Sequence, residues 1–371
     1  MSKSNSNSLR LHIDGRMIYM SGIGRCLREI IKEMTNLDKT IKIYLYGKES
    51  DYRRYLKEYS IPYDLMPFRK NNSPIYSIRE QVIGSWNNSV NRNNDVFYYP
   101  QYNLPYIVQK NSIFTIHDFI QFRFPEYFGK NKIKIARVIL DNAVRKAKKI
   151  IVVSNSTAKD FYEYFPGYKG DIEVIHNGIS SNFRVVKDVS KNNFRKINNL
   201  NKYILFIGND KPHKNISGLI DSFSNIKKEY PEFKLVIISK DFDLNKISID
   251  SSIKEDIIIV DNVSEEELIL YYNCASMLVL PSYYEGFGLP IIEAMACGCP
   301  VITSNISSMP ETGSDAAHYI DPYDHNSITE GIIKLIRDKN LRDRLIEKGY
   351  KRTRIFNWTN TAKKYLDVFR D

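Results

Sequence analysis

The chain has 371 residues, of which 43% are hydrophobic and 26% charged, and its formal net charge is +11. This composition is typical of a globular protein, and the length suits two domains of about 150 to 200 residues each. The sequence contains no run of 18 apolar residues, so a transmembrane helix is not expected. Its polar start lacks the apolar stretch of a signal peptide. We therefore expect a cytoplasmic protein.

The positive charge predicts an anionic partner, for which a nucleotide, a membrane surface and a nucleic acid are the options. The densest basic run, "KNKIKIARVILDNAVRKAKK" (130–149), carries Ile135, Ile139 and Ala143 at helical spacing. We therefore expect a helix with an apolar buried face and lysines on its outer face. That outer face is either simply solvated or docks on anionic lipid. Nucleic-acid binding is not expected, because no recognition motif accompanies the charge.

The four cysteines are Cys26, Cys274, Cys297 and Cys299. No paired CxxC motif or histidine cluster completes a zinc site. We expect them to be small buried residues with free thiols.

Short apolar runs alternate with helical patterns along the whole chain. The first half contains a helix at 22–34 and the basic helix already described. Strands are expected in the first half at 9–15, 41–47, 96–100, 112–118, 149–155 and 172–178. The second half repeats the alternation, with helices at 216–230, 264–275 and 290–297. Its expected strands are 203–208, 234–240, 256–263, 276–282 and 300–304.

Two alternating halves in succession predict two doubly wound α/β domains. The segment "FRVVKDVSKNNFRKINNLN" is charged, rich in asparagine and weakly periodic, so it is interpreted as an interdomain linker. The expected domains are 1–183 and 202–355, joined by the linker 184–201 and followed by a C-terminal helix at 356–371. Ligands of such sheets bind beyond the carboxyl ends of the strands.

The stretch "PSYYEGFGLPIIEAMACGCPVI" (281–302) places Glu285 and Glu293 with seven residues between them. A buried strand leads into a glycine-rich turn, and then into a helix with Pro290 in its first turn and Gly298 at its end. We expect Glu285 in the turn and Glu293 in the first turn of the helix. Interaction with the helix dipole would explain Glu293 alone. It does not explain why Glu285, two glycines and several aromatic residues accompany it. This pattern indicates a functional site.

A second stretch, "YILFIGNDKPHKNISGLIDSF", predicts a helix with Asn215 as its N-cap. Lys211, His213 and Lys214 then crowd the positive end of that helix, which is unfavourable unless an anion binds there. A diphosphate would reverse the sign of this interaction, because it accepts backbone N–H groups and pairs with ammonium groups. A solvated basic loop is the alternative.

The stretch "SGIGRCLREII" follows the first strand, and its glycines suit a phosphate-facing turn. It is not a dinucleotide-binding fingerprint, because Gly22 and Gly24 are followed by Leu27 where a third glycine is required.

In "TIHDFIQFRFPEYF", His117 and Asp118 end a strand. The histidine could donate to a sugar hydroxyl or to a reacting oxygen, and a structural histidine–aspartate pair explains the motif equally well.

With these four stretches in this order, the chain resembles the retaining GT-B glycosyltransferases of family 4, whose signature is two glutamates separated by seven residues. The resemblance covers nearly the whole chain. The motifs that carry it are "GIGR", "HD", "VIHNGI", "GNDKPHKN", "EGFGLPIIEAMACGCPVI" and "MPETGSDAA". It implies two Rossmann-like domains facing a cleft, with the acceptor on the first domain and the donor on the second. It also implies that the C-terminal helix crosses back to the N-terminal domain.

By this resemblance, the catalytic residues are His117, which would touch the transferred sugar, and Glu285, which would contact hydroxyls of the donor sugar. Glu293 would contact the ribose of the nucleotide and Lys214 the diphosphate. Gly22 would lie against the phosphate or the sugar.

The backbone amides of Phe287, Gly288 and Leu289 would complete the donor site. Many family members carry an arginine directly after the glycine of the phosphate loop, and this chain has Asn209 there. We expect Lys211 to supply the second positive charge instead, which is an inference of ours and not a property of the family.

The expected function is retaining transfer of a hexose, with GDP-mannose as the preferred donor. The acceptor would be a saccharide or a lipid-linked saccharide in surface-polysaccharide synthesis. The resemblance suggests attack on the same face as the leaving group, with the leaving phosphate oxygen taking the acceptor proton. No metal and no cofactor is expected, and contact with anionic lipid would make the protein peripheral on the inner face of the cell membrane.

Four alternatives stay open. The same chemistry could use a UDP-sugar or dTDP-rhamnose, or the chain could be a GT-B nucleotide-sugar epimerase. The motif "DFD" (241–243) suggests a metal-dependent single-domain glycosyltransferase. A non-enzymatic sugar-nucleotide-binding protein is the last.

Overall fold

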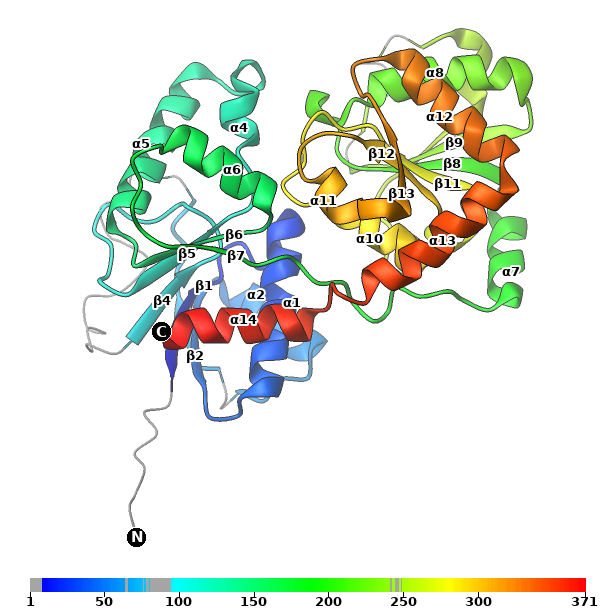
Figure 1. Ribbon diagram of the computed structural model, residues 1–371. Helices are drawn as coiled ribbons and strands as arrows, with labels where there is room; N and C mark the ends of the chain where they lie inside the picture. The colour runs from blue at the N-terminus through cyan, green and yellow to red at the C-terminus, as the bar shows by residue number, and fades with distance from the viewer. Residues whose placement is uncertain are drawn as a thin grey trace. The chain divides into compact units, whose positions relative to one another are not determined.

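The computed structural model describes residues 9–63, 66–75, 77, 80, 95–240, 242–243, 247 and 249–371. The chain forms two compact units, shown in Figure 1. Unit 1 comprises Met1–Gly178 and Trp358–Asp371, and unit 2 comprises Ile179–Asn357. Each unit contains one parallel sheet with helices packed on it. The prediction of two doubly wound α/β domains is confirmed.

The sheet of unit 1 has the strand order β3-β2-β1-β4-β5-β6-β7, and its neighbouring strands pair in parallel. All residues of the central strands β4 and β5 are buried, as expected for a parallel sheet that is covered on both faces. The strands are β1 (Arg10–Asp14), β2 (Lys42–Gly47), β3 (Phe68–Lys70), β4 (Asp95–Tyr99), β5 (Ser112–Ile116), β6 (Lys149–Val152) and β7 (Ile172–Val174).

The last helix of the described chain belongs to unit 1. This helix, α14, packs against α1, and the Tyr365 hydroxyl lies 3.1 Å from Thr115 Oγ1 on β5. The predicted return of the C-terminal helix to the N-terminal domain is therefore confirmed. The helices of unit 1 are α1 (Ser21–Leu37), α2 (Glu49–Glu58), α4 (Ile120–Arg123), α5 (Lys130–Lys146), α6 (Asn155–Tyr164) and α14 (Trp358–Arg370), with the 3₁₀ helix η2 (Pro125–Tyr127).

The sheet of unit 2 has the order β10-β9-β8-β11-β12-β13 and is also parallel. Its strands are β8 (Lys202–Ile207), β9 (Phe233–Ile238), β10 (Ile257–Val260), β11 (Met277–Leu280), β12 (Val301–Ser304) and β13 (Ala317–Ile320). Its helices are α7 (Asp188–Asn198), α8 (Ile216–Glu229), α9 (Glu265–Cys274), α10 (Leu289–Ala296), α11 (Met309–Gly313), α12 (His325–Arg337) and α13 (Lys339–Thr353), with the 3₁₀ helices η3 (Pro212–Lys214), η5 (Ser251–Asp256) and η6 (Ser314–Ala316).

The boundary between the units differs from the predicted one. Unit 2 begins at Ile179, and the predicted linker 184–201 contains α7. The single buried residue of α7, Phe194, packs edge-on against Tyr271 of α9 at 4.8 Å between ring centroids. The other apolar side chains of α7, Val189 and Ile197, are exposed, so its sequence shows little periodicity and resembles a linker.

The basic helix α5 corrects a second expectation. Ile139 and Ala143 are buried as predicted, but the side chain of Ile135 is 55% exposed. The buried stripe begins at Ala136 and continues through Leu140, one residue later than the spacing suggested. Among the described residues, no helix has the length and apolar character to cross a membrane.

The cysteines behave as predicted, since all four are buried with free thiols. Burial raises the pKa of the Cys297 thiol to about 12, with a smaller contribution from Glu293.

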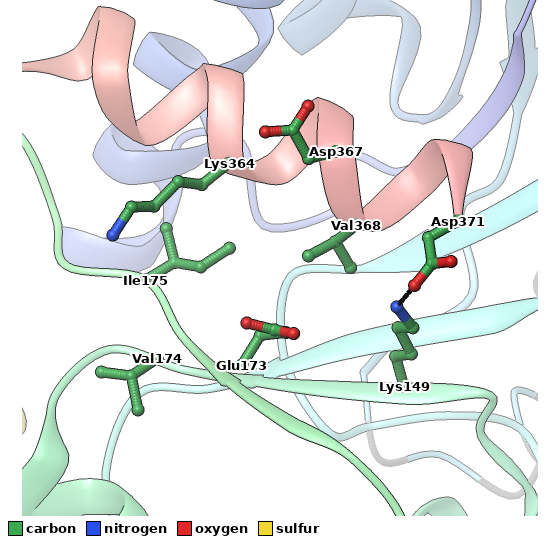
Figure 2. A pocket seen from close by; sticks show the side chains of 8 residues that line it. All are labelled: Lys149, Glu173, Val174, Ile175, Lys364, Asp367, Val368 and Asp371. Carbon is green, nitrogen blue, oxygen red and sulfur yellow. Dashed lines mark hydrogen bonds and ion pairs between the residues drawn. The ribbon is translucent and has the colours of Figure 1, made fainter.

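A cavity of about 370 Å³ lies in unit 1 between β6, β7 and α14, as Figure 2 shows. Lys149 forms an ion pair with Asp371 at one end of it. The lining residues are Lys149, Glu173, Val174, Ile175, Lys364, Asp367, Val368 and Asp371. None of the predicted site residues lines this cavity.

Candidate active site

The strand order of unit 2 reverses direction between β8 and β11. The chain runs from β8 outward to β9 and β10, and then returns to β11 on the other side of β8. Loops that leave two such neighbouring strands diverge and leave room for a ligand at the carboxyl edge of the sheet. The loop after β8 carries Lys214, and the loop after β11 carries Glu285.

These two side chains form an ion pair. Lys214 Nζ donates to both carboxylate oxygens of Glu285, at 2.7 and 2.9 Å. Ser282 Oγ donates to Glu285 Oε1 at 2.8 Å. The lysine and glutamate side chains are 13% and 9% exposed, so solvent screens the pair less than a surface pair. The carboxylate is therefore fixed in place with a cation beside it.

The backbone of Glu285 is also held. Its carbonyl oxygen accepts from Ser307 Oγ and from Ser308 Oγ, each at 2.8 Å, and its N–H donates to Ser307 Oγ at 3.2 Å. The two serines follow β12. The strands β8, β11 and β12 are neighbours in the sheet, and residues that follow each of them hold Glu285 in place.

Glu293 lies on α10, where it is 3% exposed and accepts a hydrogen bond of 2.8 Å from the Tyr272 hydroxyl. The helix begins at Leu289, which makes Glu293 its fifth residue. The prediction that Glu293 lies in the first turn is therefore wrong, because the helix starts one residue earlier than Pro290. Interaction with the N-terminal end of the dipole, which falls off within the first turn, is correspondingly a weaker explanation for this buried carboxylate.

The turn before α10 takes the shape that the glycines predicted. Gly288 has φ of +90°, a left-handed conformation that a side chain disfavours, and it is the N-cap of α10. The carbonyl of Phe287 accepts from Thr312 Oγ1 at 2.5 Å. Phe287, Gly288 and Leu289 thus lie at the N-terminus of α10, where an anion is favoured by the backbone N–H groups and the dipole.

The loop after β8 carries the predicted N-cap residue and the predicted basic cluster. Asn215 is the N-cap of α8 with φ of 53°, but its side chain does not cap the helix. Its Nδ2 donates to the carbonyl of Pro322 and its Oδ1 accepts from the Tyr283 hydroxyl. His213 is 2% exposed, and burial, followed by the charge of Lys214, lowers its pKa to about 4. At neutral pH, the cations at this end of α8 are therefore the two lysines, and His213 contributes no charge.

Asn209 and Lys211 lie at the exposed tip of this loop. Asn209 Oδ1 accepts from the backbone N–H of Lys211 at 3.3 Å. The asparagine therefore shapes the turn and places Lys211 before η3. A role for either residue in donor binding stays a prediction.

Gly22 and His117 belong to unit 1. A Cβ at Gly22, in the first turn of α1, would meet no atom within 4 Å, whereas one at Gly24 would lie 2.4 Å from the Met17 carbonyl oxygen. The fold therefore requires glycine at Gly24, and Gly22 leaves open space at the helix start. This is compatible with close approach of a ligand to Gly22.

His117 follows β5 and is partly buried. Its Nε2–H donates to the carbonyl of Pro100 at 2.9 Å, and burial lowers its pKa to about 4. Asp118 instead accepts from the backbone N–H of Ile120 at 3.1 Å. His117 is thus neutral at physiological pH, with Nδ1 as the acceptor nitrogen.

Two family models match this chain. The model for glycosyltransferase family 4 matches residues 20–183, and the model for group 1 glycosyl transferases matches residues 190–352. The chain therefore contains a glycosyltransferase family 4 domain followed by a group 1 glycosyl transferase domain. The first model matches within unit 1 and extends five residues into unit 2, and the second lies within unit 2.

Curated relatives of this glycosyltransferase include proteins named as mannosyltransferases. It is 28% identical over 288 residues to O-antigen chain mannosyltransferase B of Escherichia coli, which is 74% of each chain. It is 31% identical over 222 residues to O-antigen chain mannosyltransferase RfbU of Salmonella typhimurium, and that match spans 59% of the relative's length.

Solved structures share the GT-B fold of this glycosyltransferase. Anabaena Alr3699/HepE, in complex with UDP and glucose, superposes with a TM-score of 0.72 at 15% identity. The match covers 97% of this chain and 99% of that one.

Sequence reasoning missed several residues that support the glutamates of this glycosyltransferase, among them Ser282, Ser307, Ser308 and Tyr272. Ser282 lies three residues before Glu285, a spacing that could have indicated it. Tyr272 lies on another helix and carries no local signal.

Within the described part of the chain, no three His, Cys, Asp or Glu side chains are grouped to hold a metal ion. Asp241 of the "DFD" motif lies outside the described residues, and the independence of the glycosyltransferase from metal stays a prediction.

Proposed function

We propose that this glycosyltransferase transfers mannose from GDP-mannose, with retention of configuration, to a saccharide or lipid-linked saccharide acceptor in surface-polysaccharide synthesis. The observation that carries the proposal is Glu285, held between Lys214 and Ser282 at the carboxyl edge of the second sheet. The two O-antigen mannosyltransferases among the relatives support mannose as the sugar.

The chemistry follows from the charges. Departure of a nucleoside diphosphate develops negative charge on the β-phosphate, which fixed N–H donors and ammonium groups stabilise. Lys214 and the N-terminus of α10 supply these groups, and Lys211 is the proposed second cation. Glu285 would bind hydroxyls of the donor sugar, and Glu293 would bind the ribose. Gly22 and His117 are the proposed contributions of unit 1.

Retention requires that the acceptor enter on the face from which the diphosphate leaves, or that a carboxylate form a covalent intermediate. We propose the first route, with the leaving phosphate oxygen accepting the proton of the acceptor hydroxyl. In the second route, Glu285 would be the candidate nucleophile, but Lys214 and Ser282 already engage both of its oxygens. The anomeric configuration of the product, read by NMR, tests retention.

A second donor, UDP-glucose, is favoured by the HepE structure, which contains UDP and glucose. Thermal unfolding in the presence of GDP, UDP, dTDP and ADP, with and without magnesium, distinguishes the donors. A nucleotide at 100 times its Kd stabilises by about 2.7 kcal/mol, which is about 5 to 11 °C for a unit of this size. A shift with GDP alone supports GDP-mannose, a shift with UDP alone supports the second donor, and no shift with any nucleotide contradicts the proposal.

We also propose contact between α5 and an anionic membrane surface. Ile135 and Val138 are 55% and 62% exposed on this helix, and its acidic residue Asp141 is paired with Arg137 at 2.9 Å. The exposed basic residues of the helix are Lys130, Lys132, Lys134, Arg145 and Lys146. Apolar side chains among cations are typical of helices that bind anionic lipid.

Sedimentation with phosphatidylglycerol vesicles tests this contact, with phosphatidylcholine vesicles as the neutral comparison. Ile135→Glu should reduce binding to the anionic vesicles. Val189→Glu, on the exposed face of α7, is the matched control and should not. Equal binding of both variants would contradict the proposed surface.

A further inference from the structure

Two tyrosines form an aromatic pair beside the candidate donor site. The rings of Tyr283 and Tyr323 are stacked, with 4.8 Å between centroids and an interplanar angle of 21°. Tyr283 follows β11, and Tyr323 lies in the loop between β13 and α12. The side chain of Tyr323 is 69% exposed, so most of its surface faces solvent.

One buried side chain, Asn215, connects the two loops that carry the tyrosines. Asn215, 2% exposed, accepts from the Tyr283 hydroxyl at 2.9 Å and donates to the carbonyl of Pro322 at 2.8 Å. Asp321 Oδ1 accepts from the backbone N–H of Tyr323 at 2.9 Å. One amide thus ties together the two loops that carry the rings, and the ring of Tyr323 is stacked on that of Tyr283.

The pair is continuous with the Lys214–Glu285 ion pair. The backbone N–H of Tyr283 donates to the carbonyl of His213 at 2.8 Å. His213 precedes Lys214 directly, and Tyr283 lies two residues before Glu285. The loop after β11 therefore carries one member of each pair, Glu285 of the ion pair and Tyr283 of the aromatic pair.

The aromatic pair and the carboxylate expected to bind ribose are carried by different elements of unit 2. Tyr323 precedes α12 and Asn215 precedes α8, and these two helices pack together on one face of the sheet (Figure 1). The hydrogen bond between Tyr272 and Glu293 joins α9 and α10, which are different elements of the unit. Because Glu285 is the proposed partner of the sugar hydroxyls, a sugar bound there would lie next to the loop that carries Tyr283.

We propose that Tyr323, supported by Tyr283, is a stacking platform for a pyranose ring of the substrate. This inference rests on the proposed function and deepens it. The face of an aromatic ring carries partial negative charge, and the C–H groups on the apolar face of a pyranose carry partial positive charge. The ring that stacks belongs either to the hexose of the donor or to the saccharide acceptor.

Binding measurements by saturation-transfer NMR and by titration test the platform directly. The proteins are the wild type, Tyr323→Ala, Tyr323→Phe and Tyr162→Ala. The last removes a tyrosine of α6 that is 47% exposed and serves as the matched control. The probes are GDP-mannose and UDP-glucose for the donor, mannobiose for the acceptor, and GDP and UDP without a sugar.

Tyr323→Ala should weaken the binding of a sugar-containing probe about three- to tenfold, which corresponds to the contribution of a single aromatic contact. Tyr323→Phe and Tyr162→Ala should bind as the wild type does. Binding of GDP and UDP should be unchanged in all variants. Weakened binding of the nucleotide sugars assigns the platform to the donor, and weakened binding of mannobiose assigns it to the acceptor.

Unchanged binding of every sugar by Tyr323→Ala overturns the inference. An equal loss for GDP or UDP alone also overturns it, because the ring would then stack on the base. Failure of the proposed function looks different: the wild type itself would bind none of the nucleotides and transfer no sugar. A mannobiose affinity that depends on Tyr323 would still support the platform in that case.

Discussion

Replacing Glu285 by glutamine is the sharpest test of the candidate active site. The carboxylate accepts three hydrogen bonds, two from Lys214 and one from Ser282. A glutamine in the same rotamer retains a carbonyl oxygen at the Oε1 position. It keeps the bond from Ser282 and one bond from Lys214, and it loses the second lysine bond together with the negative charge.

The cost to stability should be small. Loss of one hydrogen bond to a charged group destabilises by about 1.5 to 3 kcal/mol. Unit 2 runs from Ile179 to Asn357, and a domain of this size loses about 2 to 4 °C in Tm for each kcal/mol. We therefore expect Tm to fall by about 3 to 12 °C, with the fold retained.

The cost to activity should be far larger. A carboxylate that is placed to bind the transferred sugar stabilises the transition state, and removing one such fixed group typically lowers kcat by about 100- to 1,000-fold. Sugar transfer from GDP-mannose, and from UDP-glucose, measures this loss. Glu347→Gln makes the same chemical change on the exposed face of α13 in the same unit, where the glutamate pairs with Lys351, and should retain full activity. Full activity of the Glu285→Gln variant would refute the site assignment.

Three further predictions concern unit 2. Tyr272→Phe removes the hydroxyl that donates to Glu293, so the free energy of unfolding should fall by about 1 to 3 kcal/mol and KM for the donor should rise; an unchanged KM would argue against the role of Glu293 in donor binding. Gly288→Ala places a side chain at φ of +90° and 3.0 Å from Ile291 Cδ1, which should cost about 1 to 2 kcal/mol, measured by urea denaturation. The third prediction concerns the pH dependence of stability. His213 has a pKa of about 4 in the folded state and near 6.5 in the unfolded state. Between these pH values, the unfolded state therefore binds more protons than the folded state. Stability should be full above pH 6.5 and fall by up to about 3 kcal/mol toward pH 4. His213→Gln should flatten this dependence, and an unaltered pH profile would contradict the assignment.

Local signals in the sequence predicted much of the fold, because they describe interactions between near neighbours. Ser264 caps α9 through a capping box with Glu267, Pro290 lies at the start of α10, and Gly298 ends it with φ of +73°. Each of these needs only a few adjacent residues to be recognised.

Features that depend on distant partners could not be read in this way. Lys214 and Glu285 are 71 residues apart. The sequence places each after a parallel strand, but the order of strands in the sheet is a property of the whole unit. Asn215 shows the same limit, since its cap position is local and the choice of Pro322 as its partner is not. For α7, one buried phenylalanine finds its partner on another helix, and the segment itself contains little evidence of it.

The return of α14 to unit 1 has a consequence for the order in which the protein can assemble on the ribosome. All of unit 2 is synthesised before α14, so unit 2 can complete its core while unit 1 still lacks the helix that packs on α1. Until then, the surface of α1 that α14 covers stays available to chaperones or to neighbouring nascent chains. In a circular permutant that begins with α14 and continues into α1, α14 would be synthesised before the rest of unit 1. Unit 1 of this permutant should then fold independently of unit 2.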